Sequence, residues 1–298
     1  GYLFIHYKYI TNRMPTADPL GAADMVIAAL GTLLVLEATR RTIGASAVSN
    51  AVALYGEGSA VGGTIDQSSS AIVRSFGRIQ SQYIPAEASV TSQAIVNAVA
   101  VNSGQTSGQD LSIVQRSTGD FVEAEASANA GNAWDLAARA RAGANQAVLN
   151  NAGGSVVTAS DQQNSSFVRA SALTTAYDYG RAQAHARGAA NELSVGNNDI
   201  YVEIDNTQFN TGGVDVTATF SGTNGYDVAV GADAVGNSVA GYACSECEGY
   251  LEAANTQTNS GDVSAVANTT VAGSNRSVIT GANAVGNSAS FYVSRPGS

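Results

Sequence analysis

The residues best suited to chemistry are two cysteines, Cys244 and Cys247, within the stretch YACSECEGY. Cys-x-x-Cys spacing is found in zinc sites and in thioredoxin-like redox sites. A structural zinc site needs four ligands, however, and the chain has no second such pair and only two histidines, His6 and His185, which stand far apart. The spacing predicts a small loop disulfide or two free thiols, with a metal or redox role as the alternative. A disulfide would indicate an oxidising compartment.

Hydrolysis and nucleotide chemistry have weaker candidates. Glu123 and Glu125 alternate along the chain, so on a strand they would share a face and could mimic a glycosidase carboxylate pair. Such acidic pairs also occur on solvated strands, and no aromatic platform for a sugar surrounds this one. His185 lies in a run of Ala and Arg, and the Gly-rich stretch at 56–63 lacks the lysine of a phosphate-binding loop. We therefore predict no enzyme activity, no cofactor and no metal site.

The composition narrows the class of protein. Only 13% of the 298 residues are charged, 32 are glycine, and the formal net charge is −10. Nucleic-acid binding depends on basic residues that neutralise phosphates, so we exclude nucleic acid as a partner. Apolar residues make up 44% of the chain, which is too many for a disordered tail. The chain should therefore fold around a core of small side chains.

Residues 1–44 differ in composition from the rest and form the first of two predicted regions. The run from Met25 to Leu36 is apolar with a helical period, which predicts a short N-terminal helix, and it is too short to span a membrane. The phrase LLVLEATRRTIG at 33–44 resembles a helix in the fused membrane subunits of tripartite dicarboxylate transporters. That resemblance covers about the first forty residues and does not extend into the second region, residues 45–298.

The second region repeats itself. GADAVGNS at 231–238 and GANAVGNS at 281–288 agree at seven of eight positions, fifty residues apart (281 − 231). NTQFNTGGVDVTATF at 206–220 aligns with NTQTNSGDVSAVANT at 255–269. Self-similarity at a fixed period is the sequence sign of a repeat architecture. More divergent copies are expected at 93–104 and 146–160 for the opening phrase, and at 126–133 for the closing phrase.

Within each repeat, the side chains alternate with a period of two. One face would carry Val214, Val216, Ala218 and Phe220 with polar residues between them, which is typical of a half-buried strand. Strands in such a repeat predict an all-β fold, an elongated β-solenoid (β-helix) of stacked coils of roughly 20–30 residues each. The competing interpretation is a helix within 133–151, because that stretch is rich in helix formers.

The repeated AVGNS phrase is predicted to form the corners of the coils. Gly236 with Asn237, and Gly286 with Asn287, are the expected structural turns, where glycine would adopt a left-handed conformation. The neighbouring Ala and Val would point into a narrow core. Asparagines and threonines at equivalent corners of stacked coils can hydrogen bond to one another in ladders.

Repeated NTQ-x-N-[ST]-G phrases, V-x-A-x-A runs, the AVGNS corners and the ending NSASFYVSRPG at 287–297 resemble the holdfast anchor protein HfaD family of stalked alphaproteobacteria. The resemblance covers roughly residues 45–298. It implies a secreted protein, held at the cell surface and associated with the outer membrane, that anchors an adhesive polysaccharide to the cell envelope. It also implies two partners, an amyloid-like curlin-type fibre subunit and an outer-membrane secretion lipoprotein, and it leaves self-association open.

Two other classes share these features. Phage tail and spike proteins are also repetitive and rich in β-structure, and some polysaccharide-degrading enzymes are β-helices with carboxylates gathered in one groove. The low charge and the abundance of Asn, Ser, Thr and Tyr favour a surface that hydrogen bonds and stacks. The predicted function is therefore cell adhesion through polysaccharide binding.

Overall fold

In a computed structural model of the chain, residues 26–34, 40–104, 107–199, 201–244 and 249–293 are described. Within these ranges the chain contains strands and no helix, so the all-β prediction is confirmed. The strands form an eight-stranded and a five-stranded sheet, and every pairing between strands is parallel. Their bounds are β1 (Val26–Leu34), β2 (Arg40–Gly56), β3 (Val61–Ser69), β4 (Ile72–Ser103), β5 (Gln109–Ser117), β6 (Phe121–Asn151), β7 (Ser155–Asn164), β8 (Phe167–Asn197), β9 (Tyr201–Asn210), β10 (Val214–Ala243), β11 (Tyr250–Asn259), β12 (Val263–Val271) and β13 (Ser277–Val293).

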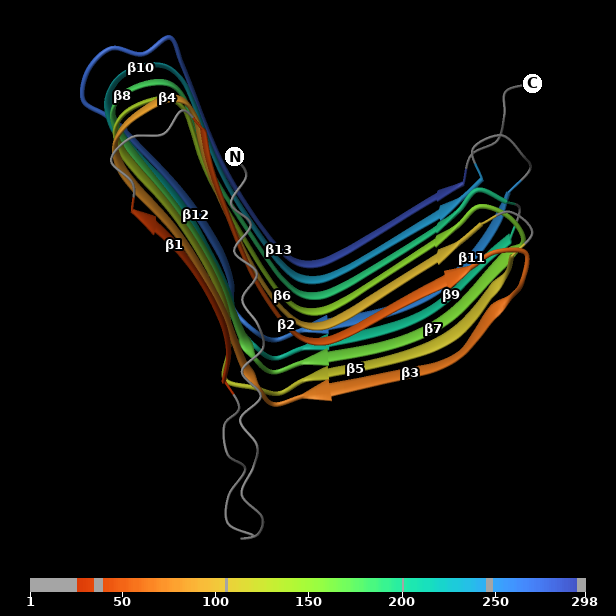
Figure 1. Cartoon of the computed structure of the whole chain (residues 1–298). Coiled ribbons are helices and arrows are strands. Elements are labelled where there is room, and N and C mark those ends of the chain that lie inside the picture. Colours follow the sequence, from red (N-terminus) through yellow and green to blue (C-terminus); the bar gives the residue numbers. More distant parts are fainter. Residues whose placement is uncertain (1–25, 35–39, 105–106, 200, 245–248, 294–298) are drawn as a thin grey trace, which may run out of the picture.

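Each coil of the solenoid is one short strand followed by one long strand, and in the last coil β12 and β13 take the place of a single long strand (Figure 1). Equivalent positions in neighbouring coils are 46 to 50 residues apart, as in the pairing of Val168 with Val214 (214 − 168) and of Val228 with Val278 (278 − 228). One coil is therefore a whole repeat. The expected coil of roughly 20–30 residues is wrong, because each long strand runs along two sides of the coil.

The coils have two thin arms that meet at an elbow (Figure 1). In β10, residues 214–222 form an outgoing half that runs along the first arm, and residues 227–235 form a returning half that packs against it. The strand then bends at the elbow and continues along the second arm, where the short strands cover it. Each arm has its own apolar core, one cluster around Ala138 and Val216 and another around Leu149 and Ile204.

The core of the first arm is built mainly from alanine, because the outgoing and returning halves of the eight-stranded sheet pack closely and leave little room between their inner faces. The predicted alternation is confirmed: Val214, Val216, Ala218 and Phe220 are buried, and the residues between them are not. The alternative prediction of a helix within 133–151 is wrong, since this stretch belongs to β6. Parallel partners on both sides, β4 and β8, supply the backbone hydrogen bonds that a helix would have made internally.

The predicted N-terminal helix is also wrong over the described residues. Residues 26–34 form β1, which pairs in register with β4 from Val26 opposite Ile72 to Leu34 opposite Gln80. Pairing along a whole strand outweighs the weak local preference for helix. The strand β2 runs without a break across the predicted boundary at residue 45. In the part of the chain that the structure describes, no helix is long and apolar enough to cross a membrane.

Gly236 and Asn237 lie at the elbow. The buried face of β10 changes phase there, from even-numbered residues before the pair to odd-numbered residues after it. Neither Gly236 nor Gly286 has a positive φ, so the expected left-handed conformation is wrong. Gly236 is required for another reason. A Cβ on it would overlap the carbonyl oxygen of Gly286 and lie 2.6 Å from Oδ1 of Asn259.

Replacing Gly236 with Ala should lower the free energy of unfolding by about 1–2 kcal/mol, because the added methyl group presses against the next coil. Gly286 is the matched control, since the nearest atom to a Cβ there is Nδ2 of Asn259 at 3.5 Å. We expect Gly286→Ala to change stability by less than about 0.5 kcal/mol. Urea denaturation of the two variants measures the difference, and equal losses would contradict this packing explanation.

Candidate functional site

A ladder of asparagines runs along the elbow through all six levels of the large sheet. In each step, Nδ2 of one asparagine donates to Oδ1 of the asparagine in the next coil at 2.8 Å. An amide carries both donors and acceptors, so it can bond to its own copy in the coil above and the coil below. The predicted ladder is therefore confirmed for asparagine. Its members are Asn50, Asn97, Asn145, Asn191, Asn237 and Asn287.

A second ladder, of glutamines, runs beside it in the five-stranded sheet and in the opposite direction. Each Nε2 donates to Oε1 of the glutamine in the preceding coil at 2.7–2.8 Å. Both ladders also donate to backbone carbonyls across the elbow, as from Asn145 to Gln163 at 2.9 Å and from Gln162 to Glu192 at 3.1 Å. The amides thus join the two sheets between the two cores. The glutamines are Gln67, Gln115, Gln162, Gln208 and Gln257.

Charged residues follow a different pattern on the outer surface. Along one row of stacked positions, Arg74, Glu123, Arg169 and Asp215 alternate in sign, with ion-pair distances of 3.3, 3.7 and 3.9 Å. A carboxylate only accepts hydrogen bonds, so it cannot bond to a copy of itself, and like charges in register destabilise the pairing. Glu125 in turn lies 3.9 Å from Arg78. The two glutamates considered as a carboxylate pair are therefore both held by arginines.

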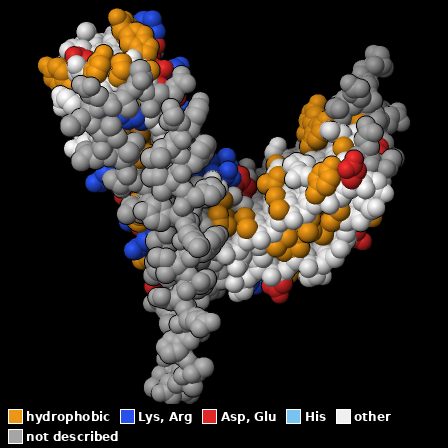
Figure 2. Space-filling model, in the orientation of Figure 1, with side chains coloured by type: hydrophobic (Ala, Val, Ile, Leu, Met, Phe, Trp, Pro, Cys, Tyr) orange, Lys and Arg blue, Asp and Glu red, His pale blue; other side chains and the backbone are white. Residues whose placement is uncertain are grey.

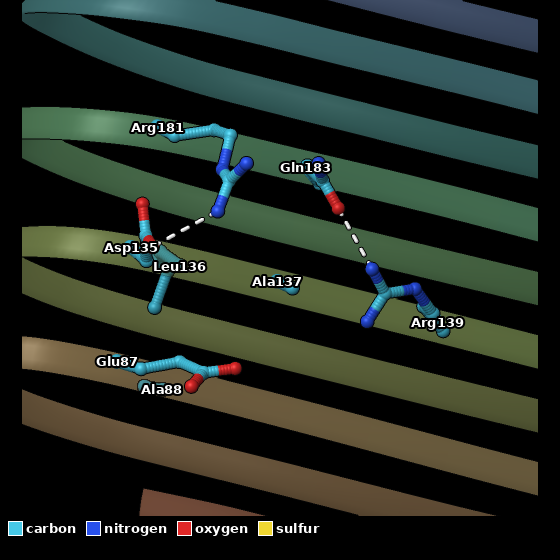
Figure 3. A pocket seen from close by; sticks show the side chains of 8 residues that line it. All are labelled: Glu87, Ala88, Asp135, Leu136, Ala137, Arg139, Arg181 and Gln183. Carbon is cyan, nitrogen blue, oxygen red and sulfur yellow. Dashed lines mark hydrogen bonds and ion pairs between the residues drawn. The ribbon is translucent and has the colours of Figure 1, made fainter. Parts of the chain in front are cut away.

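A small pocket of about 70 Å³ lies on the outer face of the returning halves of β4, β6 and β8 (Figure 3). Arg181 donates to Asp135 at 3.0 Å, and Arg139 donates to Gln183 at 2.7 Å. His185, on the same face, lies 3.2 Å from Asp233. These polar side chains are directed at one another. They therefore join neighbouring coils, as the charged row does.

Cys244 is the last residue of the described range 201–244. It is buried, has φ 53° and is disulfide-bonded, while Cys247 lies outside the described residues. Among the residues that the structure describes, no group of three or more His, Cys, Asp or Glu is placed to hold a metal ion.

A second pocket, of about 450 Å³, lies at the tip of the first arm, where the outgoing halves turn into the returning halves. Its aromatic walls come from three coils: Tyr83, Trp134 and Tyr226 are 53%, 59% and 51% exposed. The indole of Trp134 meets the ring of Tyr226 edge to face, with 6.1 Å between the ring centroids. Apolar side chains are visible at this tip in Figure 2. We call this second pocket, with Tyr83, Trp134 and Tyr226 as its aromatic walls, the tip pocket.

Two glycines allow the rings to lie against the neighbouring coil. A Cβ on Gly180 would come within 2.6 Å of the carbonyl oxygen of Trp134 and 3.0 Å of its indole, and a Cβ on Gly225 would overlap the ring of Tyr179. Tyr179 is buried, and its hydroxyl donates to Oδ1 of Asn275 at 2.7 Å. Burial raises the pKa of Tyr179 above its ordinary value, which favours the protonated form that donates this hydrogen bond. The contacts of Tyr179 with Gly225 and Asn275 thus fix the backbone at the tip.

Polar residues form one side of the tip pocket. Asn132, Asp178 and Asn224 occupy one row of stacked positions, and Nδ2 of Asn224 donates to Oδ1 of Asp178 at 3.3 Å. The sequence did not predict this site, because Trp134 and Tyr226 are 92 residues apart (226 − 134). They meet only because the coils stack on one another. The available signal was the recurrence of aromatic and glycine residues at the coil period, in GNAW, YDYG and TNGY.

Stacked parallel coils, amide ladders and an exposed aromatic tip define a β-solenoid repeat protein. A family model described as holdfast attachment protein D matches residues 25–213, and the chain belongs to this family. The family resemblance found in the sequence is thus confirmed, and the family's description implies a role at the cell surface. The match includes the stretch at 33–44 that resembles a transporter subunit. No curated protein and no solved structure matches the chain.

Proposed function

We propose that this protein anchors an adhesive polysaccharide, the holdfast, to the cell envelope as a structural protein without a catalytic site. The observation that carries the proposal is the match of residues 25–213 to the holdfast attachment family. An anchor has to resist pulling forces between a matrix and a cell. Parallel sheets cross-linked by buried amides at every level supply such resistance, because local opening of one coil would break hydrogen bonds to both neighbours.

The proposal includes a location and partners. The protein is secreted and associated with the outer membrane, where it contacts the polysaccharide, a curlin-like fibre subunit and an outer-membrane secretion lipoprotein. Among the described strands, β3 and β11 are the edges of the five-stranded sheet. A sheet edge can pair with a strand from another protein, which offers a route to a β-rich fibre partner or to self-association.

A strain that lacks this protein should make normal amounts of adhesive polysaccharide and shed it into the medium. Staining of the polysaccharide on cells and in the culture supernatant measures the partition, and a strain that carries the gene on a plasmid is the control. Loss of the polysaccharide itself would indicate a biosynthetic enzyme. Normal retention on the mutant cells would overturn the anchoring function.

A further inference from the structure

We propose that the tip pocket binds a segment of a neutral polysaccharide, with Trp134 and Tyr226 stacking on sugar rings. The inference deepens the proposed function and rests on it for the identity of the polymer. The site itself is argued from the geometry of the tip, where three exposed aromatic side chains surround a row of amide and carboxylate groups.

The aromatic walls suit the C–H faces of sugar rings. More than half of each of the side chains Tyr83, Trp134 and Tyr226 is exposed, so large apolar surfaces face water at one place on the molecule. The ring planes of Trp134 and Tyr226 differ by 63°, which leaves a corner with two apolar sides. A sugar ring in this corner removes both surfaces from water, and burial of this kind favours binding. The volume of about 450 Å³ lies in the range of ordinary ligand pockets.

The polar side of the pocket suits hydroxyl groups. A hydroxyl both donates and accepts hydrogen bonds, and the row formed by Asn132, Asp178 and Asn224 contains both donors and acceptors. Among the described residues, the positive charges next to the aromatic walls are those of Arg181 and Arg276. Each is already paired, Arg181 with Asp135 at 3.0 Å and Arg276 with Asp227 over the ring of Tyr226. The pocket therefore has no uncompensated cation to attract an acidic polymer, and Asp178 would repel one.

The length of the pocket indicates a polymer segment. Its aromatic lining begins at Tyr83 in β4 and continues through β6 and β8 to Tyr226 in β10. Three strand spacings of about 4.8 Å separate these four levels, so the aromatic residues extend over about 14 Å along the solenoid axis. That span is longer than one sugar ring, and an extended chain can follow the axis past each level in turn.

The test uses the only tryptophan of the chain, Trp134, whose fluorescence reports directly on the pocket. The probe is adhesive polysaccharide purified from wild-type cells, and polygalacturonate serves as an acidic comparison. We expect a saturable change in tryptophan emission with the purified polysaccharide and none with polygalacturonate. An unchanged emission with the polysaccharide would overturn the proposal, and a saturable change with polygalacturonate would overturn the neutral class of ligand.

Variants locate the binding surface by co-sedimentation with the same polysaccharide. Trp134→Ala and Tyr226→Ala should each weaken binding about tenfold, because each removes one stacking surface. Tyr55→Ala is the matched control, since Tyr55 is 70% exposed and lies outside the pocket. Melting temperatures should stay close to wild type in all three. Equal binding by Trp134→Ala and wild type, or an equal loss in Tyr55→Ala, would overturn the proposal.

The same variants separate this inference from the anchoring function. When Trp134→Ala is returned to the deletion strain, shed polysaccharide is expected as in the deletion itself. If the deletion sheds polysaccharide and Trp134→Ala restores retention, the tip pocket is not the contact and the anchoring function stands. If the deletion retains its polysaccharide, anchoring fails, and the fluorescence titration still decides whether the pocket binds sugar.

Discussion

Replacing Asn145 with Ala should lower the free energy of unfolding by about 4 kcal/mol or more. Asn145 is fully buried in the elbow, where it accepts from Asn97 and donates to Asn191 and to the carbonyl of Gln163. The substitution leaves the buried amides of Asn97 and Asn191 and the partly buried carbonyl of Gln163 without these partners, and each such loss in a buried site costs about 1–3 kcal/mol. Because the ladder is continuous, this one change interrupts it between the coils on either side.

The matched control for Asn145 is another asparagine that stacks on its copy but is exposed. Asn102 accepts from Asn150 at 3.2 Å on the outer surface, where water can replace the lost bond. Asn102→Ala should therefore cost about 0.5 kcal/mol or less. Urea denaturation followed by circular dichroism measures both variants. Similar small losses in the two would show that the ladder does not stabilise the elbow.

Phe220→Ala should lower the free energy of unfolding by about 3–5 kcal/mol, the usual range for a buried phenylalanine. Phe220 is fully buried in a core that otherwise consists mainly of alanine and valine. Its ring packs edge to face with Tyr179, with 4.9 Å between the centroids. Small neighbours cannot move far enough to fill the resulting cavity. The loss of this support should also loosen Tyr179 beneath the tip pocket.

Phe209 is the control for Phe220, because its side chain is 42% exposed on the outer face of β9. Phe209→Ala should cost less than about 1 kcal/mol. Thermal unfolding of the two variants gives the comparison, and the emission of Trp134 reports whether the tip has changed. A loss in Phe209→Ala as large as that in Phe220→Ala would contradict the assignment of inner and outer faces.

Local sequence patterns were sufficient for the strand interiors and for the asparagine ladder at the elbow, but not for the glutamine ladder beside it. Alternation places Val214, Val216 and Ala218 on one face whatever the shape of the coil, because successive side chains of a strand point to opposite sides. The repeat then places equivalent asparagines above one another, and amides can bond to their own copies. The resemblance to the family rested on the same repeated phrases, and the family model matches residues 25–213.

The tertiary structure alone decided the size of the coil, the strand at 26–34 and the tip pocket. A period of about fifty residues is compatible with one coil or two, and only the pairing register shows one. The apolar run after Met25 has a helical pattern, yet β4 offers it a complete row of backbone partners. Trp134 and Tyr226 face each other across Gly180 only because in-register stacking brings distant tips together. Contacts between residues so far apart in the chain depend on the register of whole strands, which local periodicity does not contain.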